Sequence, residues 1–217
     1  FILNTILNKV ASKKKKVFLT FVDLNKAYDS VNRDILWKKM EKLGFSKDFI
    51  DSIRLLYHND NINLTNMGLK TNKMYIRKGV RQGCSLSPML FAIYISDLGE
   101  SLLSQNSGFL IGHVNINSLF FADDIILLTK SRILMDKLLA LLVREGHRID
   151  MTISNKKSQV ISHDNEPHII LQDEEDNNIL LKAVKCYKYL GLEVYKTVFK
   201  TATEKQNLCI AKAKKYK

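Results

Sequence analysis

Two adjacent carboxylates, Asp123 and Asp124, stand between two apolar runs in the stretch 118–128. Each apolar run is long enough to form a buried strand, so the pattern predicts a hairpin with the acids at its tight turn. Burial of one unpaired carboxylate is costly, and a second one beside it adds like-charge repulsion that raises the pKa of one of the two. A bound divalent metal ion would remove this cost. An acidic surface turn is the alternative interpretation.

A third carboxylate, Asp23, follows the run Val17–Val22, which is β-rich and apolar on both faces. Such a run predicts a central strand in a sheet that is covered on both sides. Asp23 then stands at the carboxyl end of that strand. If the 118–128 hairpin is a neighbour in the same sheet, the fold can bring the three acids together.

The remaining elements follow from apolar periodicity and from turn and cap residues. Helices are expected at 1–11 and at 32–43, and after Ser46, after Ser87 as N-cap, and after Ser131. In the helix at 32–43 we expect Leu43 to face inward, and in the helix after Ser46 we expect Phe49 and Leu56 on the buried face. A hairpin is expected at 62–77, a loop at 79–86, and strands at 109–114, 158–162, 168–172, 179–182 and 187–194. Because helices and strands do not alternate strictly, this order indicates an α+β fold with an antiparallel sheet covered by helices.

Composition and charge narrow the class of protein. The chain has 217 residues and is 46% hydrophobic, which is enough for one large domain with a substantial core. Its 34 Lys and Arg against 22 Asp and Glu give a formal net charge of +12. That excess favours a polyanionic partner, with nucleic acid ahead of a membrane surface.

The sequence also indicates a compartment. No apolar run approaches the roughly 20 residues that span a bilayer, and no signal peptide is visible. The three cysteines are far apart, which favours a reducing compartment. We therefore expect an intracellular protein, in the nucleus or the cytoplasm and not secreted. Because the chain begins at Phe1 rather than Met, we expect an excerpt from a longer polypeptide.

Five stretches, in the same order, resemble the palm motifs of the reverse transcriptase family. The resemblance is greatest to the non-LTR, LINE-type retrotransposon enzymes. The five stretches are Phe21–Val31, Gly79–Pro88, Phe121–Asp124, Ile153–Ser158 and Tyr189–Gly191. In the fourth, Ser154 stands where these retrotransposon enzymes usually carry Asn. Five ordered motifs are a strong signal, whereas any one of them alone would be weak.

The resemblance implies a right-hand polymerase palm with partial fingers over residues 1–199, and the truncated start of a thumb helix over 200–217. It implies an RNA-directed DNA polymerase that works with an RNA template, a DNA primer, deoxynucleoside triphosphates and the rest of a retrotransposon polyprotein. Two Mg²⁺ ions, with Mn²⁺ as a possible substitute, would serve in-line phosphoryl transfer. The fingers residues that hold the triphosphate would lie mostly upstream of Phe1, so this excerpt alone is expected to be incomplete for activity.

The resemblance also assigns roles to single residues. Asp23 and Asp123 would be the main metal ligands and catalytic acids, with Asp124 in support. Tyr28 would be the steric gate that rejects a ribose 2′-hydroxyl, and Lys157 a proton donor to pyrophosphate. The other residues expected at the substrate are Arg81, Gln82, Gly83, Phe121 and Ala122, and the expected primer grip is Tyr189, Leu190 and Gly191. For Arg81 and Lys157, a solvated surface position is the alternative, and for Tyr28 it is an ordinary core tyrosine.

Other interpretations remain open at this point. One is a decayed or domesticated copy that binds nucleic acid without catalysis. Another is a palm of a group II intron maturase or of an RNA-dependent RNA polymerase. The lysines at 13–16 and those after residue 204 are expected to follow the template–primer duplex through sequence-independent phosphate contacts. The acidic segment 164–176 is expected to form an exposed hairpin.

Overall fold

The structure, a computed structural model, describes residues 1–13, 15–58, 61–62, 65–66, 69–70, 74–75, 77–161, 168–172 and 178–195. The expected thumb helix and the lysines after residue 204 lie outside these residues, as does Lys14. The helices in the described part are α1 (Ile2–Ser12), α2 (Ala27–Ser30), α3 (Arg33–Lys42), α4 (Lys47–His58), α5 (Ser87–Leu103) and α6 (Arg132–His147). The strands are β1 (Phe18–Asp23), β2 (Asn61–Ile62), β3 (Thr65–Asn66), β4 (Leu69–Lys70), β5 (Met74–Tyr75), β6 (Phe109–Ile111), β7 (Val114–Ile116), β8 (Ser118–Phe121), β9 (Asp124–Thr129), β10 (Gln159–Ile161), β11 (His168–Gln172), β12 (Asn178–Ala183), β13 (Cys186–Tyr189) and β14 (Leu192–Tyr195).

A six-stranded sheet organises the molecule, with strand order β11-β12-β10-β1-β9-β8. Its strand pairs are antiparallel except for β10 and β12, which are parallel. β1 lies in the interior of the sheet, between β9 and β10. The expected α+β fold is therefore confirmed, with a sheet that is antiparallel apart from the β10–β12 pair, and the run Val17–Val22 forms most of the central strand β1, as its apolar pattern predicts.

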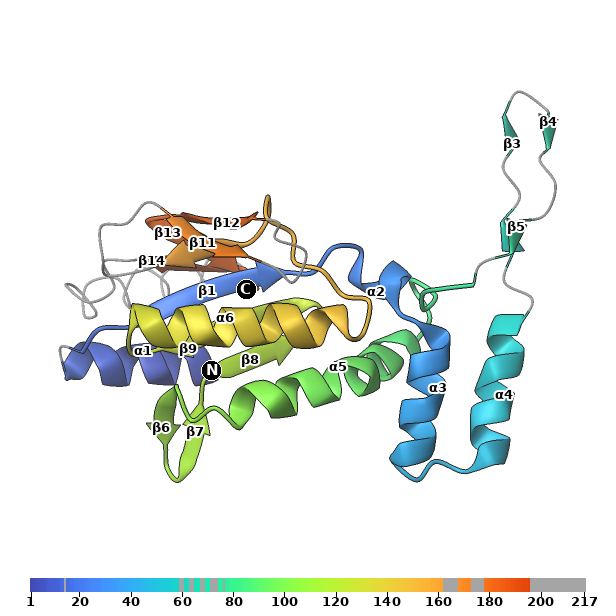
Figure 1. The fold of residues 1–217 in the computed structure, drawn as a ribbon, viewed down its shortest axis with the longest axis horizontal. Helices are drawn as coiled ribbons and strands as arrows, with labels where there is room; N and C mark the ends of the chain where they lie inside the picture. The colour runs from blue at the N-terminus through green and yellow to red at the C-terminus, as the bar shows by residue number, and fades with distance from the viewer. Residues whose placement is uncertain are drawn as a thin grey trace, which may run out of the picture.

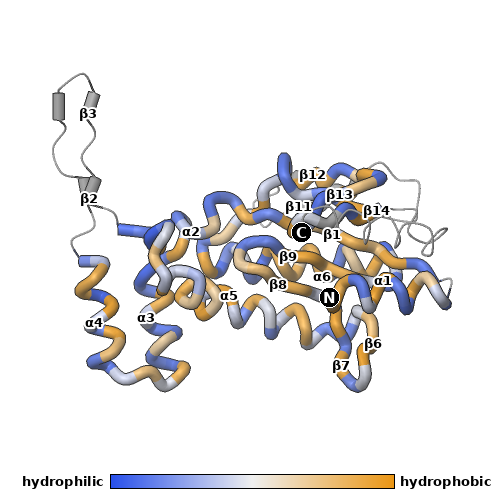
Figure 2. The backbone as a smooth tube through the Cα atoms, turned by 180° about the vertical axis from the view of Figure 1, so that it is seen from behind, coloured by the Kyte–Doolittle hydropathy of each residue, from blue (hydrophilic) through white to orange (hydrophobic). Residues whose placement is uncertain are grey.

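Both faces of the sheet are covered. Successive side chains of a strand point to opposite faces, so Phe18 and Val22 enter one hydrophobic core while Leu19 and Phe21 enter the other. The first core is closed by α3, α5 and α6, which lie across the sheet and at its end in Figure 1. The second is closed by α1. Figure 2 shows hydrophobic residues along β9, which lies between β1 and the edge strand β8, and each fully buried Leu or Ile there contributes about 1.5–3 kcal/mol.

Helices α3 and α4 stand at one end of the molecule, and the short strands β3 and β4 project beyond them (Figure 1). The side chain of Asn32 caps α3 by accepting hydrogen bonds from the amides of Asp34 and Ile35. Leu43, expected to face inward, is 56% exposed, because α3 ends at Lys42 and Leu43 leaves its buried stripe. On α4, Phe49 and Leu56 also stay exposed.

Three further expectations are corrected. Residues 109–114 do not form one strand, because the chain turns between β6 and β7. Residues 187–194 likewise contain the turn between β13 and β14. Ser87 is the first residue of α5 rather than its N-cap, and its hydroxyl donates instead to the carbonyl of Arg81, 2.5 Å away.

Two more expectations fall partly outside the described residues. The hairpin expected over the acidic segment is present as the antiparallel pair β11 and β12. Residues 162–167 and 173–177 lie outside the description, so the exposure of the acidic residues remains a prediction.

Among the residues that the structure describes, no helix combines the length and hydrophobicity needed to cross a membrane.

Candidate active site

The central strand pair brings the carboxylates together. β1 and β9 are antiparallel, and their register makes Asp23 the direct partner of Asp124. Directly opposed side chains of an antiparallel pair lie on the same face with their Cβ atoms about 4.5–5.5 Å apart. Asp123 precedes Asp124 in the turn between β8 and β9. We call these three residues the acid cluster, and the predicted meeting of the strand end with the hairpin turn is confirmed.

The turn that carries Asp123 is tight. Phe121 pairs directly with Asp124, so Ala122 and Asp123 alone form the connection. Ala122 has a φ of +52°, in the left-handed region that side chains rarely adopt, at a cost on the order of 1 kcal/mol. Phe121 is 60% exposed beside this turn. Such strain is common at functional sites, and here it fixes the direction in which the chain presents the two acids.

The acid cluster has too little positive charge around it to balance its carboxylates. Burial raises the pKa of Asp124, and the charges of Asp123 and Asp23 raise it further, while Lys157 opposes them. The two adjacent acids also act on different neighbours. Burial, and then the charge of Asp123, raise the pKa of Tyr28, whereas burial, and then the charge of Asp124, raise the pKa of Tyr187 and of Tyr189. The charge of Asp123 therefore acts on Tyr28, and that of Asp124 acts on the two tyrosines of β13.

The segment 151–158 binds the end of β1 and delivers Lys157 to it. The amide of Ser154 donates to the carbonyl of Asp23 over 2.8 Å, and the amide of Asp23 donates to the hydroxyl of Ser158 over 3.0 Å. Lys157 Nζ then lies 3.3 Å from Oδ1 of Asp23. The bond from Ser154 uses its backbone, so the presence of Ser in place of Asn leaves that contact intact.

Tyr28 lies on α2, immediately after β1. Its ring stacks on that of Phe91 of α5, with centroids 4.9 Å apart and planes 12° from parallel. The amide of Val80 donates to the carbonyl of Tyr28 over 2.8 Å, and Gln82 Nε2 donates to Oδ1 of Asp29 over 3.1 Å. The fold therefore brings Gln82 next to the Tyr28 segment, with exposed Gly83 following it.

Arg81 points elsewhere. Its guanidinium donates to the carbonyl of Leu56 and lies over the ring of Tyr57, 5.4 Å from the centroid. It therefore contacts the C-terminal end of α4 rather than the acid cluster. A contact of Arg81 with template or triphosphate remains a prediction.

The hairpin of β13 and β14 packs against the acid cluster's strand through aromatic rings. Tyr187 stacks on Phe21 with centroids 4.1 Å apart, and Tyr189 lies 5.9 Å from the same ring. Leu190 and Gly191 form the turn, with φ of +45° and +79°, as two-residue hairpin turns require. Sequence reasoning missed Phe21 and Tyr187, although the alternation that places Tyr187 and Tyr189 on one face was available.

The donor set suits a hard divalent cation. Oδ1 of Asp23 is buried and accepts no hydrogen bond, and the three side chains offer only carboxylate oxygens, which Mg²⁺ prefers. Among the described residues, no group of three His, Cys, Asp or Glu side chains is already arranged around a metal position. Asp23 is instead engaged by Lys157, whose ammonium group lies 3.3 Å from Oδ1.

A mixed sheet covered by helices, with acids on a central strand and on the adjoining hairpin turn, defines the palm of a nucleic-acid polymerase. Three comparisons identify the family of polymerases to which the chain belongs. The family model for "Reverse transcriptase (RNA-dependent DNA polymerase)" matches residues 2–194. The chain is 27% identical over 205 residues to the Pol polyprotein of the type-1 retrotransposable element R2 of Nasonia vitripennis, which covers 88% of this chain. It is 32% identical over 151 residues to the corresponding R2 polyprotein of Popillia japonica, which covers 69% of this chain.

The chain therefore belongs to the reverse transcriptase family, and the expected resemblance to non-LTR retrotransposon enzymes is confirmed. It spans 19% and 25% of the lengths of these two relatives. Among solved structures, an apo telomerase from Candida tropicalis superposes with a TM-score of 0.62 at 14% identity, covering 89% of this chain and 37% of the telomerase chain. That likeness shows the shared fold.

Proposed function

We propose that this protein is the RNA-directed DNA polymerase domain of a non-LTR retrotransposon, and that it adds deoxynucleotides to a primer 3′-hydroxyl. The observation that carries the proposal is the pairing of Asp23 with Asp124, with Asp123 in the adjoining turn. Family membership and the Pol polyproteins among its relatives support it. The RNA template, DNA primer, deoxynucleoside triphosphates and the rest of a polyprotein are its proposed partners, in the nucleus or cytoplasm.

Asp23 and Asp123 are the proposed ligands of two Mg²⁺ ions, with Asp124 in support. When bound, such ions activate the attacking hydroxyl and stabilise the leaving pyrophosphate. Tyr28 borders the sugar of the incoming nucleotide on the Asp123 side, and its ring is held by Phe91. Gln82 and Gly83, beside Asp29, and Phe121 and Ala122, at the turn, are the other proposed contacts of the incoming nucleotide.

Two further roles belong to this proposal. Lys157 is close enough to the acid cluster to donate a proton to the leaving group. Tyr189, Leu190 and Gly191 hold the primer end, since their hairpin packs on Phe21, two residues before Asp23 in the same strand.

The test is primer extension on an RNA template with Mg²⁺, using the full-length protein and its Asp123→Asn variant. Extension should fall by about a hundredfold or more, because an essential charge is removed while the shape of the side chain is kept. Asp136→Asn is the matched control, since Asp136 pairs with Arg132 on α6. Undiminished extension by Asp123→Asn would refute the metal site, and RNA binding without any extension by the parent would support a non-catalytic copy instead.

A further inference from the structure

The C-terminal end of α4 is bound by two arginines. The last carbonyls of a helix have no helical partner and carry the negative end of the helix dipole. Here Arg81 donates to the carbonyl of Leu56, and Nη1 of Arg33 donates to that of Tyr57 over 3.2 Å. The guanidinium of Arg33 also lies 4.7 Å from the centre of the Tyr57 ring. Arg33 is therefore fixed to α4 by a hydrogen bond and by a cation–π contact.

Arg33 also reaches the segment 79–82, which carries Gln82. Its Nε donates to the carbonyl of Gly79 over 2.8 Å. Gly79 has a φ of +88°, and a Cβ at this position would lie 3.0 Å from Cα of Asp29, so a larger residue does not fit without displacement. Arg33 therefore contacts the segment 79–82 at Gly79, where this segment is already packed against Asp29.

The segment 79–82 in turn touches the proposed nucleotide pocket. The amide of Gly79 donates to the carbonyl of Val31, and that of Val80 to the carbonyl of Tyr28, each over 2.8 Å. Gln82 bonds to the side chain of Asp29. One set of hydrogen bonds thus runs from the end of α4 through Arg33 to the backbone on which Tyr28 and Gln82 are mounted.

We propose that Arg33 is a positioning residue for the nucleotide pocket: it holds the segment 79–82, and with it Gln82 and the backbone of Tyr28, against the end of α4. This inference rests on the proposed polymerase function. An arginine is required because two different nitrogens of one planar group donate to two carbonyls while the same plane contacts the Tyr57 ring. A lysine offers a single charged centre and cannot reproduce all three contacts.

The test compares Arg33→Gln, Arg33→Lys and Arg54→Gln in the full-length protein. Arg54 is the matched control because it makes the same kind of link between α4 and α3, through Glu41 and the Trp37 ring rather than through Gly79. In Arg33→Gln, KM for deoxynucleotides should rise about tenfold while kcat stays within about threefold, as loss of charge-assisted hydrogen bonds at a positioning group implies. Discrimination against ribonucleotides should fall as well, and Arg33→Lys should restore these values only in part.

Hydrogen–deuterium exchange gives a second measurement that needs no activity. The amides of Gly79 and Val80 should exchange faster in Arg33→Gln and Arg33→Lys than in the parent. Their exchange rates in Arg54→Gln should equal those of the parent. If Arg33→Gln fails to fold, both the kinetic and the exchange measurements are made on Arg33→Lys. Equal changes in Arg33 and Arg54 variants, or full rescue by lysine, would overturn the positioning role. If the parent protein did not extend primers, the proposed function would be refuted. The exchange data would still decide separately whether Arg33 holds the segment 79–82.

Discussion

Lys157 Nζ lies 3.3 Å from Oδ1 of Asp23, although the two residues come from distant parts of the chain. The side chain of Lys157 is 69% exposed, whereas that of Asp23 is only 20% exposed. The pair is therefore asymmetric: the carboxylate is held in the sheet, and the ammonium is free to move toward solvent when another cation approaches. In the absence of a metal ion, Lys157 is a counterion for the acid cluster.

Replacement of this lysine should change how the protein responds to Mg²⁺. Lys157→Gln should lower the metal-free stability by less than about 1 kcal/mol, since partly exposed ion pairs contribute little. Mg²⁺ should raise the melting temperature more in the variant than in the parent, because no lysine then competes for Asp23. Thermal melting in EDTA and in Mg²⁺ measures both effects.

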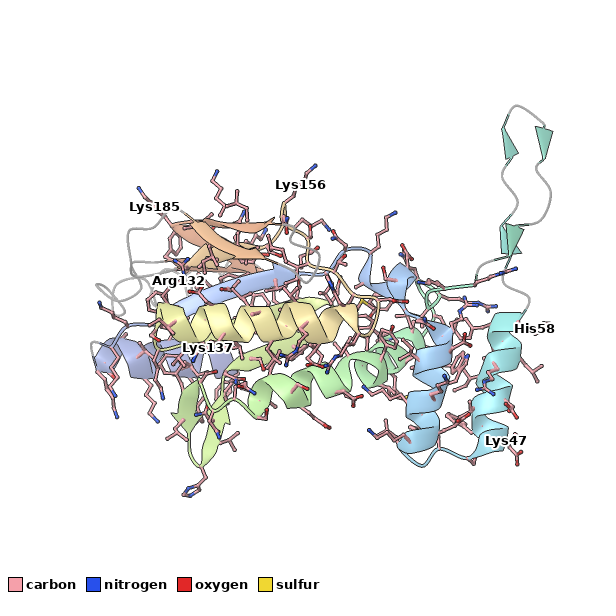
Figure 3. All side chains as sticks on the ribbon, in the orientation of Figure 1. Lys47, His58, Arg132, Lys137, Lys156 and Lys185 are labelled. Carbon is pink, nitrogen blue, oxygen red and sulfur yellow. The ribbon has the colours of Figure 1, made fainter. Side chains whose placement is uncertain are left out.

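Lys156→Gln is the control for that measurement, since Figure 3 shows the Lys156 side chain pointing away from the ribbon. It should behave like the parent in both conditions. An equal Mg²⁺ effect in the parent and in Lys157→Gln would show that Lys157 does not compete with the ion.

Asp150 should make stability depend on pH. A hydrogen bond from Lys78 at 2.9 Å, and then one from Asn32 at 3.1 Å, lower the pKa of Asp150 from its ordinary value of 3.8. A carboxyl with a lowered pKa stabilises the folded state fully above its unfolded pKa and loses this effect as the pH falls through the folded pKa. Asp150→Asn should therefore cost up to about 1 kcal/mol at pH 7, and less as the pH falls below about 3.8.

Urea unfolding at pH 7 and pH 3 measures this difference. Asparagine is a suitable replacement because Asp150 has a φ of +55°, which Asn tolerates. Glu100→Gln, on the exposed side of α5, is the control. A pH-independent difference between the parent and Asp150→Asn would mean that the charge of Asp150 is not what stabilises this contact.

Tyr28 should determine sugar selection. Its ring is stacked on Phe91, so Tyr28→Ala opens space without removing the support beneath it. Ribonucleotide incorporation should rise roughly 10- to 100-fold relative to deoxynucleotide incorporation, which is the range that pocket shape commonly contributes. Tyr28→Phe should keep the parent's selectivity, because the proposed gate is the ring rather than the hydroxyl. Competition between the two nucleotide types in primer extension measures the ratio, and an unchanged ratio in Tyr28→Ala would remove the gate assignment.

The Phe21–Tyr187 stack should connect hairpin stability to primer use. Tyr187→Leu removes a close ring contact beneath the β13–β14 hairpin and should reduce the free energy of unfolding by about 1–2 kcal/mol. The same variant should release primers sooner, so products become shorter. Tyr187→Phe keeps the stack and should match the parent in both measurements. If Tyr187→Leu destabilised the protein without shortening the products, the hairpin would not be the primer contact.

Much of the palm was predictable, and the errors have physical causes. Val17–Val22 could be identified as a central strand because it is apolar on both faces, and the meeting of Asp23 with the 123–124 turn follows from a sheet in which the hairpin is a neighbour. Helical periodicity continues through Leu43 and predicts that it is buried, but the helix ends one residue earlier. The turns within 109–114 and 187–194 were missed because alternation alone does not show where a strand reverses.

Other features carry no local signal. The bonds of Arg33 to Gly79 and Tyr57 join three segments, and nothing in the residues around Arg33 distinguishes it from a solvated arginine. The contact of Lys157 with Asp23 depends on how the segment 151–158 pairs with the end of β1. Such contacts become visible only when the strand register is known.

The position of β1 also affects how the protein is made. One of its neighbours, β9, comes from the middle of the chain, and the other, β10, from beyond residue 158. Pairings between distant segments form late, because long loops must close first. A nascent chain that has reached α5 thus carries the apolar run Val17–Val22 with both strand edges unpaired, which is a state prone to aggregation. Synthesis therefore passes through a vulnerable interval that ends only when Ile161 has left the ribosome, and chaperone binding to the emerging run would protect it.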